Sequence, residues 1–132
     1  MTTFIDTSFF IALLTKEDRF HAKADEAWKS LLESDASLVS TNYTLLETFS
    51  LIQNRLGLEA VTDFQRDVVP LLSLEWVDEN YHEAGLASVL TAKRRNLSLV
   101  DCVSFEVMRR NGVKNILTFD KHFGEHGFHC LP

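Results

Sequence analysis

The chain has few of the residues that stabilise small extracellular or zinc-binding domains. It contains only two cysteines, Cys102 and Cys130, which lie far apart and show no Cys-x-x-Cys spacing. That spacing argues against a zinc site and against a disulfide framework. Both cysteines lie in apolar segments, so we expect two buried free thiols.

Glycine and proline are scarce as well, at five and two residues, and no Ser/Gly-rich linker, low-complexity run or internal repeat divides the chain. With 132 residues, of which 45% are hydrophobic and 24% charged, the chain has the size and composition of one folded domain with its own core. We therefore expect a single domain over residues 1–132.

Long apolar runs and the common nucleotide- and zinc-binding motifs are missing. The apolar run Phe9–Leu14 is too short to cross a bilayer, and Asp6 precedes it where a signal peptide would have Lys or Arg. We expect neither a signal peptide nor a membrane anchor, and hence a cytoplasmic protein. The absence of P-loop, glycine-rich dinucleotide and His-Glu-x-x-His patterns argues against those enzyme classes.

Positive charge is in the minority, because 13 Lys and Arg residues face 19 Asp and Glu residues, which gives a net charge of −6. Nucleic-acid backbones are bound largely through Lys and Arg. A nucleic-acid partner would therefore need a local basic patch around a bound cation.

Hydrophobic spacing predicts strands that alternate with helices. The apolar segments 3–6, 38–41, 74–77 and 115–119 are typical of strands, and 128–131 fits an edge strand. Helical spacing is found at about 9–14, 20–33, 42–56, 59–69, 78–95 and 101–110. This alternation predicts an α/β fold with a mainly parallel sheet and helices on both of its faces.

Four acidic residues fall where such a sheet places its functional sites, outside the carboxyl ends of the strands. Asp6 ends the first strand and Asp120 follows the fourth, while Glu47 lies about one helical turn beyond the second. Asp101 stands at the start of the helix that leads into the fourth strand. In a parallel sheet all four side chains emerge at one edge, so we expect them to lie together.

Clustered carboxylates repel one another unless a cation neutralises them. Mg²⁺ and Mn²⁺ favour carboxylate and water oxygens, and a cation held there can activate water and orient a phosphodiester. Each residue also has a simpler interpretation. Asp6, Asp101 and Asp120 stand where Asp serves as a helix N-cap, and Glu47 is out of phase with the apolar stripe of its helix, as on a solvated face.

The segments FIDTSFF, TNYTLLETFS, LSLVDCVSFEVMRR and ILTFDKHF resemble, in order and spacing, the acidic motifs of PIN domains, most closely those of VapC-type toxins. The resemblance runs from Thr3 to about the C-terminus. It implies a three-layer α/β/α sandwich with a central, mainly parallel sheet of four to five strands. It also implies an endoribonuclease that depends on Mg²⁺ or Mn²⁺ and cleaves single-stranded or structured RNA as the toxin of a toxin–antitoxin pair.

Carried over residue by residue, the resemblance implies catalytic roles for Asp6, Glu47, Asp101 and Asp120. Asp6 and Asp101 match the central metal ligands of the family, and Asp120 matches its further acidic residue, which contacts the metal directly or through water. Glu47 matches the family's glutamate on the helix after the second strand. Neighbouring polar residues can orient carboxylates or water, although local capping explains them equally well; they are Thr7, Ser8, Ser104 and Thr118.

The resemblance also implies an RNA substrate, a homodimer and a small antitoxin protein as partners. Lys121, beside Asp120, is the best-placed basic residue for RNA contact. Arg94 and Arg95 are weaker candidates, because they stand at a predicted helix end where a cation also stabilises the helix dipole. His122, next to the site, fits a surface or structural role better than proton transfer.

Three other interpretations compete with a nuclease. A haloacid dehalogenase-type phosphatase needs a second Asp two residues after the first, where this chain has Ser8, and a receiver domain needs an acidic pair where Ile5 and Asp6 supply only one acid. A PIN scaffold that binds RNA or protein without cutting is the stronger rival. The presence of all four acids argues against it.

Overall fold

The computed structural model describes residues 1–132, with a five-stranded parallel sheet at its centre. The strand order is β3-β2-β1-β4-β5, and every neighbouring pair is parallel. The strands are β1 (Thr2–Ile5), β2 (Ser37–Thr41), β3 (Ser73–Glu75), β4 (Asn115–Leu117) and β5 (His129–Leu131). The predicted α/β class and the parallel sheet are confirmed.

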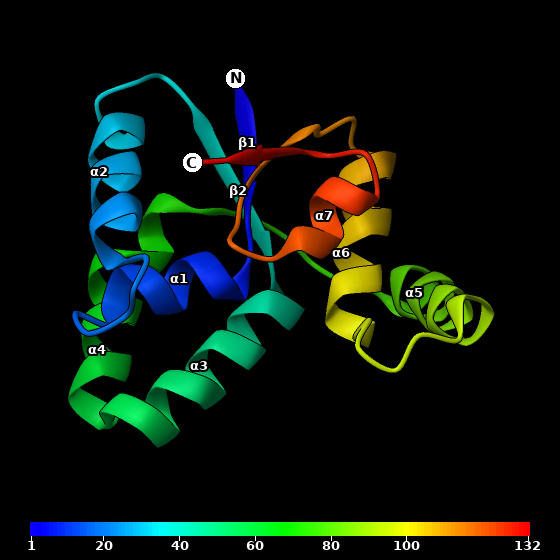
Figure 1. The fold of residues 1–132 in the computed structure, drawn as a ribbon, viewed down its shortest axis with the longest axis horizontal. Coiled ribbons are helices and arrows are strands. Elements are labelled where there is room, and N and C mark those ends of the chain that lie inside the picture. Colours follow the sequence, from blue (N-terminus) through cyan, green and yellow to red (C-terminus); the bar gives the residue numbers. More distant parts are fainter.

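Helices pack on both faces of this sheet (Figure 1). They are α1 (Thr7–Leu14), α2 (His21–Leu32), α3 (Asn42–Leu56), α4 (Leu58–Asp67), α5 (Glu79–Ala92), α6 (Leu99–Arg110) and α7 (Lys121–Glu125), with a 3₁₀ turn at Val69–Leu71. None of these helices has the length and apolar character needed to cross a membrane.

Two adjacent residues of β1 show how the layers form. Phe4 and Ile5 are both fully buried, but they belong to different hydrophobic clusters, because successive side chains of a strand point to opposite faces. Ile5 packs with residues of α1 to α4, whereas Phe4 packs with residues of α6 and α7. This arrangement gives the three-layer α/β/α sandwich.

Some local predictions need correction. Helix α6 begins at Leu99 and is capped by Ser98, so Asp101 lies within its first turn and is not the N-cap. Helix α3 has the predicted bounds, and Thr41, the last residue of β2, caps it. Cys102 is a buried free thiol, as predicted, but Cys130 is exposed because it lies on the edge strand β5.

Parallel pairing brings the carboxyl ends of the central strands to one edge of the sheet. β1 ends beside β4 with Ile5 aligned with Leu117, and the chain then turns into α1 and towards α7. Asp6 and Asp120 cap those two helices. The strand topology therefore delivers two acidic side chains to the same edge.

Candidate active site

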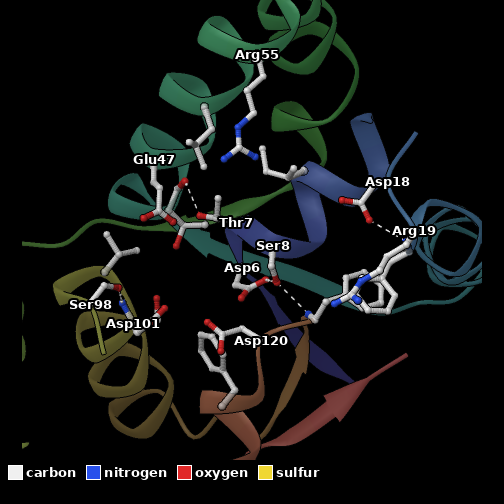
Figure 2. A pocket seen from close by; sticks show the side chains of 18 residues that line it. Asp6, Thr7, Ser8, Asp18, Arg19, Glu47, Arg55, Ser98, Asp101 and Asp120 are labelled. Carbon is white, nitrogen blue, oxygen red and sulfur yellow. Dashed lines mark hydrogen bonds between the residues drawn. The ribbon is translucent and has the colours of Figure 1, made fainter. Parts of the chain in front are cut away.

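A cavity of about 480 Å³ opens at this edge between α1, α3 and α6 (Figure 2). We call it the acidic groove, because its lining includes all four predicted acids: Asp6, Glu47, Asp101 and Asp120. The four side chains come from four separate places in the fold and are drawn around one space in Figure 2. The predicted convergence of the four acids is thus seen in the structure.

Asp6 is the most deeply placed of the four acids, with 6% of its surface exposed. Its Oδ1 accepts hydrogen bonds from the Ser8 hydroxyl at 2.8 Å and the Phe9 amide at 3.1 Å, and its Oδ2 accepts one from the Thr118 hydroxyl at 2.7 Å. Burial raises the pKa of Asp6 to about 7, although these hydrogen bonds oppose the shift; nearby Asp120 adds to it.

Asp101 lies in the first turn of α6, where the Ser98 hydroxyl accepts a hydrogen bond from its amide at 3.1 Å. Its side chain is 17% exposed. Burial raises the pKa of Asp101, and repulsion from Asp120 raises it further, while hydrogen bonds from Ser98 oppose both effects. A carboxylate in such a place is better stabilised when a cation is near.

Asp120 caps α7 through a 2.9 Å hydrogen bond from the His122 amide to its Oδ1. Its own amide donates to the Thr118 hydroxyl oxygen at 2.9 Å. Thr118 therefore contacts both Asp6 and Asp120, and it holds the two acidic positions at a set separation. Asp120 is a helix N-cap, as anticipated, but the capping hydrogen bond uses only its Oδ1.

Glu47 reaches the groove from α3, opposite Asp101 and Asp120 (Figure 2). It is half-buried and lies out of phase with the core stripe of its helix, as the sequence indicates. The other face of α3 is not simply solvated, however, because Glu47, Leu51 and Arg55 recur every four residues and all three line the groove.

The four supporting residues also lie in or beside the groove. Ser8 and Thr118 bond directly to Asp6, and the Ser8 hydroxyl also accepts the Phe119 amide at 2.9 Å. Thr7 contacts α3, since its hydroxyl donates to the Thr44 carbonyl at 3.5 Å. Ser104 is buried in the groove wall on α6. Ser8 and Thr118 thus orient a carboxylate, whereas Thr7 joins two helices.

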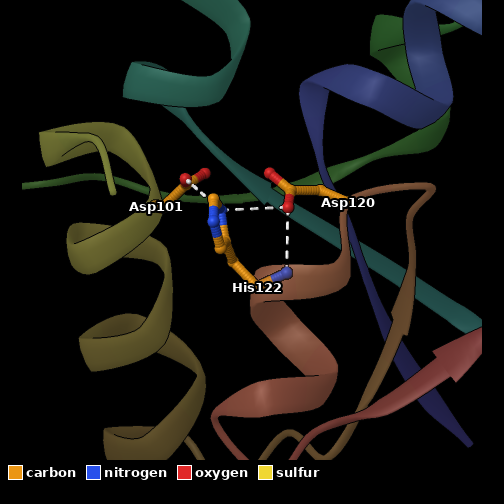
Figure 3. Close-up of side chains that lie close together, drawn as sticks. All are labelled: Asp101, Asp120 and His122. Carbon is orange, nitrogen blue, oxygen red and sulfur yellow. Dashed lines mark hydrogen bonds and ion pairs between the residues drawn. The ribbon is translucent and has the colours of Figure 1, made fainter. Parts of the chain in front are cut away.

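His122 is a residue whose place the sequence did not reveal. It is 7% exposed, and its Nδ1 lies 3.1 Å from Asp120 Oδ1 and 3.6 Å from Asp101 Oδ2 (Figure 3). One possible donor atom from each of Asp101, Asp120 and His122 lies within 4.8 Å of the other two. The only signal in the sequence was its position two residues after Asp120, in the first turn of α7.

The basic residues of the groove also differ from those expected. Arg19 and Arg55 line it, but Lys121, Arg94 and Arg95 do not. Lys121 is exposed on α7, and Arg94 pairs with Glu125 at 3.2 Å. Arg19 lies over the Phe20 ring, with its guanidinium carbon 4.6 Å from the ring centroid. The groove therefore combines five acids, the four predicted ones and Asp18, with the two cationic side chains of Arg19 and Arg55.

The residues of the groove fit a divalent cation. They offer several carboxylate oxygens that repel one another, and beside Asp101 and Asp120 lies the buried imidazole of His122, whose two nitrogens make no hydrogen bond. Asp101 and Asp120 are the residues best placed to hold such an ion, with Asp6 beneath them. When bound, a divalent cation supplies charge neutralisation and Lewis-acid polarisation of a phosphodiester.

Comparison with known proteins agrees with the resemblance seen in the sequence. The family model for the PIN domain matches residues 3–128. The chain is 32% identical over 126 residues to "23S rRNA-specific endonuclease VapC20" of Mycobacterium tuberculosis, which covers 95% of this chain and 94% of that protein.

Solved structures agree with this match. The crystal structure of Mycobacterium tuberculosis VapC20, described as a "Sarcin-Ricin loop cleaving toxin", superposes with a TM-score of 0.85 at 29% identity, covering 97% of this chain and 96% of the other. FitAcB from Neisseria gonorrhoeae superposes with a TM-score of 0.70 at 14% identity, covering 100% and 97% of the two chains, and this similarity concerns the fold alone.

Proposed function

Because the chain belongs to the PIN-domain family, we propose that it is a metal-dependent endoribonuclease that uses Asp6, Glu47, Asp101 and Asp120. The observation that carries this proposal is the meeting of these four acids, from four separate elements, in one groove. Capping explains single aspartates, but it does not explain why Glu47 faces them from α3. The cofactor proposed is Mg²⁺ or Mn²⁺, since the acids supply oxygen ligands.

The acids differ in environment, and we assign their roles accordingly. Asp101 and Asp120 are partly accessible and hold the cation. Asp6 is buried and hydrogen-bonded, and it contributes negative charge from beneath them, as a ligand or through water. Glu47 stands on the opposite wall, where it can orient the water that attacks the phosphodiester.

The basic side chains of the groove are the candidates for RNA contact. Arg19 and Arg55 are the proposed phosphate contacts at the scissile position, because a guanidinium binds phosphate through paired donors. Lys121 is placed for RNA that continues past Asp120, and Arg94 and Arg95 only for more distant parts of a long substrate. These two arginines would supply the local positive charge that RNA binding needs in a chain with a net charge of −6.

The relative's substrate suggests one for this chain. VapC20 is described as specific for 23S rRNA and as cleaving the sarcin–ricin loop, so we propose a structured ribosomal RNA loop as the substrate to test first. By the same reasoning, we propose that the protein is the toxin of a toxin–antitoxin pair, forms a homodimer and binds a small antitoxin. The acidic groove and the net charge of −6 suit an antitoxin segment that is basic.

The test is cleavage of a sarcin–ricin loop hairpin and of an unstructured RNA by the purified protein, with the products mapped at single-nucleotide resolution. Cleavage should need Mn²⁺ or Mg²⁺, stop on addition of EDTA, and fall below detection in Asp6→Asn and Asp101→Asn. Asp35→Asn is the matched control, because Asp35 is exposed in the loop between α2 and β2. Cleavage that survives both site variants would show that the active site lies elsewhere.

A non-cutting PIN scaffold remains the alternative, and the same experiment decides it. That scaffold would bind RNA in a gel-shift assay but would cut neither substrate with any divalent metal. An Arg55→Gln variant separates binding from chemistry, since it should weaken binding and reduce the salt dependence of affinity while the four acids stay in place.

A further inference from the structure

His122 lies where a metal ligand would be needed, yet its imidazole has no hydrogen-bonding partner. It is 7% exposed, and neither Nδ1 nor Nε2 makes a hydrogen bond. Nε2 makes neither a hydrogen bond nor an ion pair, and Nδ1 has only two carboxylates at ion-pair distance, so the ring lacks the hydrogen bonds that buried polar groups of native proteins usually make. Its closest polar neighbours are the carboxylates of Asp101 and Asp120 (Figure 3).

The spacing around His122 is that of ligands that share one ion. Nδ1 lies 3.1 Å from Asp120 Oδ1 and 3.6 Å from Asp101 Oδ2, and one donor atom from each residue lies within 4.8 Å of the others. Two ligands at right angles, each about 2.1 Å from a cation, are about 3.0 Å apart. A cation therefore fits among these three side chains with small adjustments.

The backbone holds His122 in this position. Asp120 caps α7 by accepting the His122 amide at 2.9 Å, so the carboxylate and the imidazole leave the same first turn. Phe123, the next residue, is fully buried against Phe105 of α6, with ring centroids 5.0 Å apart. The ring is thus fixed beside Asp120 and opposite Asp101.

We propose that Asp101, Asp120 and His122 form a mixed carboxylate–imidazole site that binds a first-row transition-metal ion in preference to Mg²⁺; this rests on the metal-dependent function proposed above. Mg²⁺ takes oxygen ligands and gains little from imidazole, whereas transition-metal ions bind imidazole nitrogen well. An active site of carboxylates alone would discriminate less between these ions, because carboxylate oxygens suit both Mg²⁺ and Mn²⁺. His122 therefore sets which ion the site selects.

The test measures metal binding directly, without reference to cleavage. Mn²⁺ is added to the metal-free protein, and pulsed EPR is used to detect coupling between the ion and a nitrogen nucleus. Protein labelled with ¹⁵N-histidine shows whether that nitrogen belongs to a histidine. Calorimetry then compares the affinities for Mn²⁺ and Mg²⁺ in the wild type, His122→Phe and His129→Phe.

His129 is the matched control. It is the first residue of β5 and pairs with Asn115, the first residue of β4, so it lies at the amino-terminal ends of the strands, away from the groove at their carboxyl ends. The wild type and His129→Phe should show histidine nitrogen coupling. His122→Phe should lose it and bind Mn²⁺ at least about tenfold more weakly, with Mg²⁺ affinity nearly unchanged. If His122→Phe fails to fold, the wild-type spectrum still tests the inference: histidine coupling supports it, because His122 is the histidine beside Asp101 and Asp120, and the absence of coupling contradicts it.

Two results would overturn the inference while leaving the proposed function intact. The first is tight Mn²⁺ binding that depends on Asp101 but shows no histidine coupling. The second is a His122→Phe variant whose affinities for Mn²⁺ and Mg²⁺ both increase by the same factor. That result is expected if His122 is protonated and only forms ion pairs with the two carboxylates. If Mn²⁺ binding is the same in Asp101→Asn as in the wild type, the metal site itself is wrong, and with it the proposed function.

Discussion

Replacing Asp6 with Asn should make the metal-free protein more stable at neutral and alkaline pH, because the change removes a buried negative charge. Asp6 is 6% exposed, and burial raises its pKa to about 7 from the ordinary value of 3.8. Asn has nearly the same shape and serves equally well as a helix N-cap, which is the role that Asp6 plays for α1. The substitution therefore changes charge more than structure.

The sign of the pH dependence follows from proton linkage. Because the pKa of Asp6 is higher in the folded than in the unfolded chain, the folded state keeps a proton that the unfolded state has already released. The stability that this proton contributes is fully present below pH 4 or so and is lost as the pH rises through about 7. A raised carboxyl pKa thus destabilises the metal-free protein as the solution becomes more alkaline.

The two pKa values determine the size of the effect. They differ by roughly three pH units, and at about 1.4 kcal/mol per unit the lost stability is at most about 4 kcal/mol. Asn keeps an acceptor for the Phe9 amide, but the Thr118 hydroxyl must turn, at a pH-independent cost of about 1 kcal/mol. The pH-dependent part should therefore exceed this cost above pH 7.

The assay is urea unfolding in EDTA from pH 4 to pH 8. The free energy of unfolding should fall more steeply with pH for the wild type than for Asp6→Asn, with the gap widest at pH 8. Asp35→Asn, which changes an exposed Asp, should follow the wild type. Parallel curves for the wild type and Asp6→Asn would refute the burial of an ionisable Asp6.

Two further predictions concern contacts around the site and between the helices. Thr118→Val removes the hydroxyl that donates to Asp6 at 2.7 Å, so the pKa of Asp6 should rise further. In urea unfolding, the pH at which the protein loses stability should then be higher than in the wild type, whereas Thr118→Ser should behave as the wild type. Gly85→Ala should lower the free energy of unfolding by about 1–3 kcal/mol in urea, because a Cβ there would lie 2.4 Å from the Val103 side chain. Gly124→Ala, where the nearest atom would be 3.7 Å away, is its control, and equal stabilities for the two variants would contradict the close packing of α5 on α6.

The sheet and two of the acids could be predicted because their signals are local. Adjacent apolar residues such as Phe4 and Ile5 indicate a strand buried on both faces, and parallel strands bring Asp6 and Asp120 to one edge. Helix boundaries were less certain. Ser98 caps α6 three residues before Asp101, so this helix begins at Leu99 and not at about residue 101, where its predicted range starts.

The rest of the groove depends on how helices pack, which local spacing does not specify. Glu47 appeared solvated because its helical phase excludes it from the core, whereas α3 turns that second face towards the groove. The recurrence of Glu47, Leu51 and Arg55 every four residues was a usable signal for this face. Arg19 and His122 have no comparable pattern, since Arg19 reaches the groove from a loop and His122 lies beside Asp101 and Asp120 at the start of the short helix α7.

The most direct test of the proposed active site is RNA cleavage by protein freed of metal and then reconstituted with Mn²⁺. Cuts at defined positions should appear on adding Mn²⁺, disappear with EDTA, and be absent in Asp101→Asn prepared in the same way. Equal cleavage by Asp101→Asn, or by the wild type in EDTA, would contradict a metal-dependent site built on these acids.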